Sequence, residues 1–365
     1  MAPNSGLTHP YQQQLSRTVC QNSSLQNVKS DLEVALHRAF SIGNRPYKAA
    51  TVVFINWSND DMGVVQRQEE LAEVFRDKLH YRTEFYTIKT EDEHMHFNIV
   101  QWLLNLAKVR GGKDSLIILM YSGYGQTVPD DSGRNEFIIG GDSNYMAYNF
   151  KGPPTSLSWH QAVSIVETHA GDVLHILDSD HSGYMVVNDG PEILAATSPV
   201  GQISFSSVLR DTLHSLNGSP VSASGLFARV CQQLHASGLE EMPVYVPNLR
   251  QKTSVILHSL APDSITSLAQ TPPKDVPKSG IRLLITVHVA DSINPELMIQ
   301  FKSWLSKEIP SICDSVKVEV QGSSSIGSSS LLLLTIPIEM WYYLPMGKKY
   351  TYLAIVRSGI VTDLN

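Results

Sequence analysis

Three short apolar runs, almost free of charge, constrain the fold of this chain most strongly. They are ATVVFINW at residues 50–57, SLIILMYSG at 115–123 and DVLHILD at 172–178. A strand that is buried on both faces gives such a continuous run, whereas a strand with one face in water alternates apolar and polar residues. Helical segments lie between the runs. This alternation predicts an α/β fold, with a mostly parallel central sheet and helices on both faces.

The helical segments have apolar residues at a spacing of three to four. They are residues 25–40, 64–80, 90–109, 158–170, 204–216 and 223–235. Thr90 and Glu93 stand in capping-box positions and predict that the third of these helices starts at Thr90. YRTEFYTI at 81–88 alternates like a strand, and TSVILHSL at 253–260 is expected to supply the last strand of the sheet.

A change of composition divides the chain. The stretch APDSITSLAQTPPKDVPKS, residues 261–279, contains four prolines among small polar residues and predicts a linker. The expected organisation is a flexible tail and helix at 1–45, an α/β domain at 46–262, a linker at 263–279 and a small α/β domain at 280–365. The last domain reads as strand, helix, strand, strand, helix, strand, which is the order of a ferredoxin-like unit. Within it, QGSSSIGSSS at 321–330 is expected to be an exposed loop.

Composition and charge exclude several classes of function. The net charge is -7 and no basic stripe is present, so we expect no nucleic-acid partner. No stretch has the length and hydrophobicity of a membrane span or of a signal peptide, so we expect a cytoplasmic protein without membrane contact. The three cysteines, Cys20, Cys231 and Cys313, match no disulfide or metal-ligand spacing. Reduced thiols and the absence of a cofactor or metal are expected, with Cys231 as a core residue of its helix.

Two strand ends carry recognisable motifs. YSGYG at 121–125 and DSDHSG at 178–183 resemble the surroundings of the catalytic histidine and cysteine in caspase and metacaspase peptidases. Residues 56–75 and 191–213 resemble further segments of caspase-like domains, the first as found in fungal signalling proteins. The resemblance covers about residues 48–260 and implies a caspase-like three-layer sandwich, with helices on both faces of the central sheet.

The resemblance places the family's general base at Tyr124 and its nucleophile at Asp180. Neither residue is of the required type. A phenol with an ordinary pKa near 10 holds its proton at neutral pH, whereas imidazole can accept one. A carboxylate is also a far poorer nucleophile than a thiolate toward an amide. The sequence therefore predicts a pseudo-peptidase, with no catalytic residues.

Other parts of the site are expected to survive. Gly123, Gly125 and Gly183 would keep the tight backbone, and backbone N–H groups near Gly125 and Asp180 would stand where the family forms its oxyanion hole. The resemblance makes Asp178, Ser179, Asp60 and Asp61 remnants of a pocket that prefers an Arg or Lys side chain. A hydrogen bond from Tyr124 to Asp180 would satisfy both replaced groups.

The predicted function is binding, as a regulator or scaffold in cell-death or signalling assemblies. The partner would be a protein or peptide, such as a basic segment or an active metacaspase, and the oligomeric state is left open. One alternative is a hydrolase of altered chemistry that uses Asp180 and Tyr124. Another is a plain interaction module that binds through an aromatic patch at Trp341, Tyr342 and Tyr343, although core packing is the preferred interpretation of these three residues.

Two further candidate sites are weak. His94 and His96 lie two residues apart on a helix and point to different faces, so a solvated first turn is preferred over a metal site. Ser179, Asp180 and His181 are consecutive, and three consecutive side chains cannot line up as a catalytic triad.

Overall fold

The structure of the chain is a computed structural model. It describes residues 24–40, 47–129, 135–141, 156–179, 182, 190–196, 204–238, 242–251, 253–261, 281–312, 316–326, 329–345, 347 and 349–356. The described residues form two compact units: those of 24–40 and 281–356 belong to one, and most of those from 47 to 261 belong to the other. The linker expected at 263–279 lies outside the described residues.

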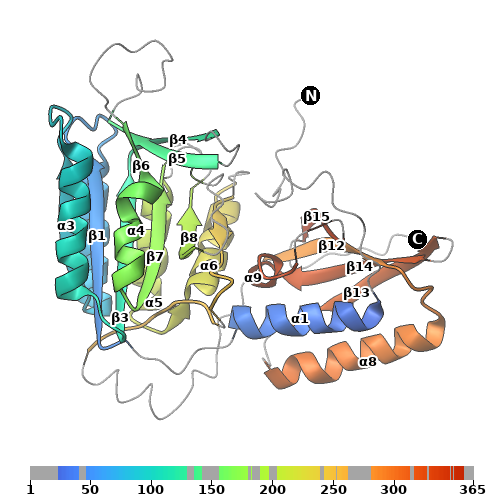
Figure 1. Cartoon of the computed structure of the whole chain (residues 1–365). Coiled ribbons are helices and arrows are strands. Elements are labelled where there is room, and N and C mark those ends of the chain that lie inside the picture. Colours follow the sequence, from blue (N-terminus) through green and yellow to red (C-terminus); the bar gives the residue numbers. More distant parts are fainter. Residues whose placement is uncertain are drawn as a thin grey trace. The chain divides into compact units, whose positions relative to one another are not determined.

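A six-stranded sheet forms the centre of the larger unit (Figure 1), in the order β10-β8-β7-β3-β1-β2. Its strands are β1 (Ala49–Trp57), β2 (Arg82–Ile88), β3 (Ser115–Ser122), β7 (Asp172–Asp178), β8 (Glu192–Ala195) and β10 (Val244–Val246). Neighbouring strands run parallel except for β10, which is antiparallel to β8. Every residue of β3 is buried, as its apolar run predicted. The predicted mostly parallel central sheet is therefore confirmed.

The last strand of this sheet was predicted in the wrong place. The expected strand at 253–260 contributes only β11 (Ile256–Leu257), which pairs with β9 (Val221–Ser222) in a separate two-stranded sheet. The edge strand β10 comes instead from residues 244–246, a run of three residues. So short a run carries no detectable periodicity.

Helices cover both faces of the central sheet (Figure 1). Helices α3 (Met95–Arg110) and α4 (Trp159–His169) pack against each other on one face. On the other face α5 (Phe205–Leu216) packs against both α2 (Val64–Leu79) and α6 (Ala223–Ala236). The arrangement is a three-layer sandwich, and its mixed α/β class agrees with the fold predicted from the sequence.

Serine side chains cap three of these helices. Ser158, Ser204 and Ser222 each accept a hydrogen bond from a backbone N–H in the first turn of α4, α5 and α6. The capping box predicted for α3 is wrong, because that helix begins at Met95 rather than at Thr90. Asp92 accepts a hydrogen bond from the N–H of His94 at 2.9 Å, which satisfies a backbone donor just before the helix.

A small antiparallel sheet follows directly on the carboxyl end of β3. It has the order β4-β5-β6, with β4 at Tyr124–Pro129, β5 at Asn135–Gly140 and β6 at Ser156–Ser158. Only Gly123 separates β3 from β4, so the chain leaves the central sheet through this one residue. The sequence did not predict this second sheet.

The smaller unit contains a four-stranded antiparallel sheet of order β13-β14-β12-β15. Its elements along the chain are β12 (Arg282–Val289), α8 (Pro295–Ile312), β13 (Glu319–Ile326), β14 (Ser329–Pro337), α9 (Ile338–Trp341) and β15 (Tyr350–Val356). Most of the segment 321–330 lies in β13 and β14 rather than in an exposed loop, so that prediction is wrong. Gly322, Ser323 and Ser324 pair with Leu333, Leu332 and Leu331, and this pairing outweighs their low strand propensity.

Helix α1 (Leu25–Phe40), which was predicted from its periodicity, belongs to the smaller unit. Five of its residues form a buried apolar stripe that packs against α8 and α9: Val28, Leu32, Ala35, Leu36 and Ala39. Asp31 accepts hydrogen bonds from Lys349 Nζ at 2.5 Å and from the Tyr350 hydroxyl at 2.8 Å. The helix is thus fixed by apolar burial and by one polar cluster.

The smaller unit offers no exposed aromatic patch at residues 341–343. Trp341, Tyr342 and Tyr343 are each at most 5% exposed, so the core interpretation is confirmed and the aromatic binding patch is wrong. In the described part of the chain, no helix combines the length and hydrophobicity that a membrane span requires.

Candidate functional site

The two motifs meet at the carboxyl edge of the central sheet. Strands β3 and β7 are parallel neighbours, with Ser122 paired to Asp178 at their ends. Strand β1 lies on the other side of β3 and also ends at this edge. Residues that follow parallel strands gather at such an edge, where α/β proteins usually carry their sites. The segments after β1, β3 and β7 therefore form one candidate site.

Tyr124 is held by an acid from the first of these segments. Its hydroxyl donates a hydrogen bond to Asp61 Oδ1 at 2.9 Å, and its backbone carbonyl accepts one from the Tyr121 hydroxyl at 2.6 Å. Asp61 is exposed, whereas Tyr124 is half-buried. Asp180 lies outside the described residues, so the expected contact between Tyr124 and Asp180 stays a prediction. The phenol acts here as a hydrogen-bond donor.

Asp60 has a role within the fold. Its Oδ2 accepts a hydrogen bond from the N–H of Val64 at 2.8 Å, and its Oδ1 accepts one from the N–H of Met62 at 3.1 Å. Gly63, the N-cap residue of α2, has a left-handed φ of 67° and makes no side-chain cap. Asp60 therefore supplies the acceptor that the start of α2 needs.

Asp178 is bound at the beginning of α5. The Ser206 hydroxyl and the Ser206 N–H both donate to its carboxylate. Burial raises the pKa of Asp178 above its ordinary value, while the bonds from Ser206 and the nearby positive charge of Arg67 act in the opposite direction. The carboxyl group is thus engaged by groups of its own chain.

Backbone conformation explains one glycine of the site, and close packing explains another. Gly123 has a φ of 145°, which L side chains rarely adopt, and its N–H donates to the carbonyl of Asp178 at 3.3 Å. A Cβ at Gly125 would lie 2.2 Å from Ser179 Oγ and 2.5 Å from Phe137 Cζ. Ser179 itself is 4% exposed, so its side chain fills space against Gly125. Gly183 lies outside the described residues.

Ser182, in the second motif, is buried and was not singled out from the sequence. Its hydroxyl lies 2.9 Å from the carbonyl oxygen of Ser179 and 2.7 Å from that of Ala196. Ala196 follows β8 directly, and its N–H donates to the carbonyl of Leu177 in β7. Ser182 therefore ties the turn after β7 to the end of the neighbouring strand.

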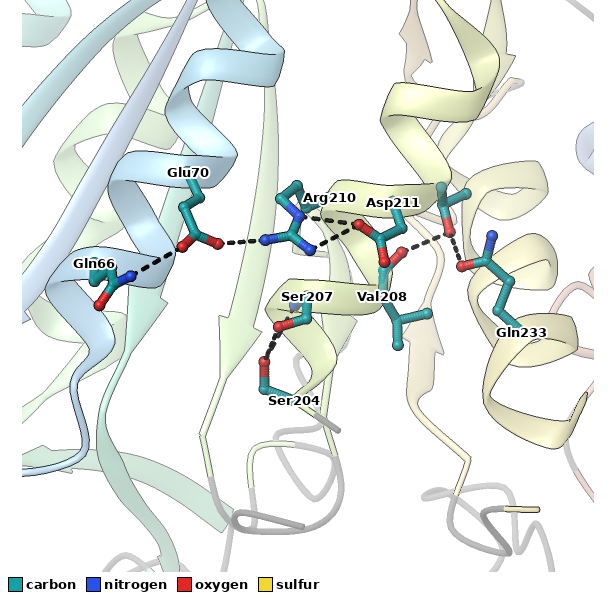
Figure 2. Close-up of polar contacts among 9 residues, drawn as sticks. Gln66, Glu70, Ser204, Ser207, Val208, Arg210, Asp211 and Gln233 are labelled. Carbon is teal, nitrogen blue, oxygen red and sulfur yellow. Dashed lines mark hydrogen bonds and ion pairs between the residues drawn. The ribbon is translucent and has the colours of Figure 1, made fainter. Parts of the chain in front are cut away.

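A polar network joins α2 to α5, the two helices that pack together on one face of the central sheet (Figure 2). Arg210 of α5 forms an ion pair with Glu70 of α2 and a second one with Asp211 at 2.9 Å. Gln66 Nε2 donates to Glu70 Oε1 at 3.2 Å. Glu70 and Arg210 each lie about one turn beyond Arg67 and Ser206, so the network joins α2 and α5 near the start of both helices.

The other sites considered in the sequence have no support as metal or catalytic centres. Within the described ranges, no group of three or more His, Cys, Asp and Glu side chains is arranged to hold a metal ion. His94 and His96 are exposed at the start of α3, as expected for a solvated first turn. Cys231 is fully buried in α6, which confirms it as a core residue. His181 lies outside the described residues.

Sequence reasoning missed Arg67 and Ser206 as members of the site. Both were placed correctly on amphipathic helices, but neither belongs to a strand end. The hydrogen bond from Ser206 to Asp178 and the electrostatic effect of Arg67 on Asp178 both depend on how α2 and α5 pack on the sheet. The only available signal was the position of Ser206 in the first turn of a helix, where its N–H has no partner within the helix.

Comparisons with known proteins give similarity in structure alone. No family model matches the chain, and no curated protein matches it. Similar solved structures include caspase-1 from Spodoptera frugiperda, with 12% identity, a TM-score of 0.39 and coverage of 57% of this chain and 91% of that one. A protein from Geobacter sulfurreducens has 14% identity, a TM-score of 0.38 and coverage of 62% and 98%.

The Drosophila initiator caspase Dronc has 6% identity, a TM-score of 0.36 and coverage of 55% and 80%. Two of these three structures are caspases.

Proposed function

We propose that the chain is a catalytically inactive, caspase-like protein that acts by binding a protein or peptide at the carboxyl edge of its central sheet. The observation that carries the proposal is the hydrogen bond from the Tyr124 hydroxyl to Asp61. At the position where the resembling peptidases have their base, this chain has a hydroxyl group that donates a hydrogen bond and keeps its proton.

The replaced residues support inactivity. A phenol cannot take a thiol or water proton at neutral pH, and a carboxylate at position 180 is a weak nucleophile toward an amide. In a serine peptidase, the loss of either the nucleophile or the base alone lowers turnover by roughly 10⁶. The proposal therefore assigns no peptidase activity to the natural chain.

Binding is supported by the charge that faces solvent. Asp61 is exposed and uses Oδ1 for Tyr124, which leaves Oδ2 as an acceptor for a ligand. A basic segment is the preferred partner, since a guanidinium can donate two hydrogen bonds to one carboxylate. The resemblance to caspases and metacaspases adds a role as regulator or scaffold in cell death or signalling, with an active metacaspase among the partners.

A restoration experiment tests the proposal. The natural protein, the two single variants and the double variant Tyr124→His, Asp180→Cys are assayed with fluorogenic peptides that end in Arg, Lys or Asp. We expect activity in the double variant alone, because only that variant has both base and nucleophile. Circular dichroism spectra of all four proteins control for folding.

Two results would count against the proposal. Hydrolysis by the natural protein that Asp180→Asn abolishes would establish the altered hydrolase instead. A folded double variant that neither cleaves nor binds any of the peptides would show that no working groove exists at this edge, and binding would have to be sought elsewhere on the chain.

A further inference from the structure

Strand β2 stands at one end of the central sheet and pairs with β1 on one side only in the described part of the chain. The N–H of Ser58 donates to the carbonyl of Ile88 at 2.8 Å, so Ile88 turns its backbone polar groups toward β1. Successive residues of an edge strand turn these groups to alternate sides. Thr83, Phe85 and Thr87 therefore direct their N–H and carbonyl groups to the outer edge of the sheet.

The features that usually protect an edge strand are missing from β2. Such strands are very short, or carry a proline, a bulge or free charges. Strand β2 has seven residues, no proline and an unbroken register with β1. Its two charged residues are Arg82, at the first position, and Glu84, which forms an ion pair with Arg110 at 3.0 Å. The outer edge of β2 is thus a ready template for a further strand.

The side chains along this edge favour pairing with another strand. Phe85 is 45% exposed, and its ring stacks on Phe54 of β1 with the centroids 5.1 Å apart. On the same face it is flanked by Thr83, which is half-buried, and by Thr87, which is exposed. Aromatic and threonine side chains stabilise antiparallel pairs when they lie opposite each other across two strands.

The edge of β2 is complementary to itself. A second β2 that runs antiparallel about a two-fold axis at Phe85 places Phe85 opposite its own copy and Thr83 opposite Thr87, so all the outward groups meet in hydrogen-bonded pairs. On the other face, Glu84 lies opposite Tyr86, and no like charges face each other. A shift of two residues toward the start of the strand would instead place Glu84 opposite its own copy, which is unfavourable.

The charges of α2 agree with the same two-fold axis. Arg76 Nη1 donates to Thr83 Oγ1 at 3.0 Å, so this side of α2 lies beside the edge. Glu69 lies two turns earlier on the same side, and both residues are exposed. Because α2 leads directly back into β2 and runs antiparallel to it, the two-fold axis turns Arg76 of one copy toward Glu69 of the other.

We propose that the outer edge of β2 is a homodimer interface, at which two copies of the chain join their central sheets by antiparallel pairing of β2 centred on Phe85. The partner of this surface is a second copy of the chain. The inference does not depend on the proposed function, because none of these residues belongs to the peptide site.

The test compares two double variants that are matched in position. Sedimentation equilibrium is measured over a series of concentrations for the natural full chain, for Thr83→Glu with Thr87→Glu, and for Thr83→Lys with Thr87→Glu. Both variants lose the same threonine hydroxyls, which contact Arg76 and Asn56. They differ only in the charges that they place opposite each other across the two-fold axis.

We expect the natural chain to form dimers as its concentration rises. The variant with two glutamates brings like charges together at two places, and its dimer dissociation constant should rise by about tenfold or more. The variant with lysine and glutamate brings opposite charges together and should dimerise about as well as the natural chain. Circular dichroism spectra of all three proteins control for folding.

Hydrogen exchange of the natural chain, followed by NMR, locates the interface without any substitution. The amides of Thr83, Phe85 and Thr87 should exchange more slowly as the concentration rises, since pairing gives them acceptors. The amides of Glu84 and Tyr86 already point toward β1 and are the internal control. This measurement decides alone if a double variant does not fold.

Four results would overturn the proposal. The first is a natural chain that stays monomeric at every concentration, and the second is a dimer that the folded variant with two glutamates forms equally well. The third is equal weakening of the dimer in both folded variants, because the predicted pairing of Thr83 with Thr87 would then be wrong. The fourth is protection of the three outward amides in the monomer, which would show that another part of the chain covers this edge.

Discussion

His175 in β7 gives the sharpest prediction of pH dependence. The imidazole is 1% exposed, and its Nδ1 lies 3.4 Å from Trp159 Nε1. Because the indole nitrogen can only donate, Nδ1 must accept, and the ring proton is then on Nε2. That nitrogen faces Glu167 Oε1 at 3.6 Å, too far for a hydrogen bond, and neither atom has another partner. The site accommodates a neutral ring.

Burial is the larger cause, and the charge of His160 on α4 the smaller one, of a shift that lowers the pKa of His175 from 6.5 to about 3. Between these two values the unfolded chain binds a proton at this residue and the folded chain does not. The contribution of His175 to the free energy of unfolding is therefore fully present above the unfolded pKa. It is lost as the pH falls through the window from 6.5 to 3. From pH 7 to pH 5 the expected loss is about 2 kcal/mol.

Glu167 contributes to the pH dependence of stability with the opposite sign. Burial raises its pKa above the ordinary value, so the folded state takes up its proton first and gains stability as the pH falls. This contribution is present both in the natural protein and in His175→Asn. Comparison of these two proteins therefore isolates the histidine. Asparagine keeps an acceptor for Trp159 and cannot titrate.

The assay is hydrogen exchange of the β7 amides in urea at pH 7 and pH 5, which reports opening of the central sheet separately from the smaller unit. His214→Asn, which removes an exposed imidazole from α5, is the control. The natural protein should lose about 2 kcal/mol more than His175→Asn over this range. A difference below about 0.5 kcal/mol would refute the claim that the buried ring stays neutral.

Three further substitutions test the packing. Gly125→Ala would force a Cβ against both Ser179 and the Phe137 ring and should lower the unfolding free energy by about 1–3 kcal/mol in urea titration. Ser182→Ala removes a buried hydroxyl between two strand ends and should cost about 1–2 kcal/mol, with faster exchange of the β8 amides as the specific sign. Asp31→Asn weakens the contact with Lys349 and should increase proteolytic release of α1, whereas unchanged protection would show that the apolar stripe alone holds the helix.

The sequence predicted the central sheet well because three of its strands are buried on both faces and give continuous apolar runs. It failed for β10, which is three residues long, and for β13, whose serines and glycine are poor strand formers. Strand β13 exists because the leucines of β14 present a complete partner strand. Such pairing is decided between segments and leaves no periodicity in either one.

The start of α3 shows a similar limit. Thr90 and Glu93 have the spacing of a capping box, yet Thr90 contacts Ser58 after β1, and its N–H donates to Ser58 Oγ at 3.3 Å. The backbone N–H and the hydroxyl of Thr90, which a capping box would use to start the helix, are both taken up by Ser58. Asp92 then satisfies the N–H of His94 instead.

The site was predictable in its location and less so in its chemistry. Motif spacing placed Tyr124 and Asp178 at adjacent strand ends, because parallel strands that are neighbours in a sheet bring their carboxyl ends together. The partners of these residues come from other elements. Asp61 reaches Tyr124 across 63 positions of sequence, and Ser206 reaches Asp178 across 28. No local pattern encodes these distances.

The residues that make the two motifs recognisable have physical roles that do not depend on catalysis. Gly123 carries a φ that other residues avoid, Gly125 leaves room for Ser179, Asp178 binds the start of α5, and Ser182 joins two strand ends. Each would be required in a chain of this fold whether or not it cleaves peptides. Position 124 differs, because its half-buried side chain donates a hydrogen bond to an exposed acid. The proposed loss of catalysis is therefore compatible with preservation of these four residues.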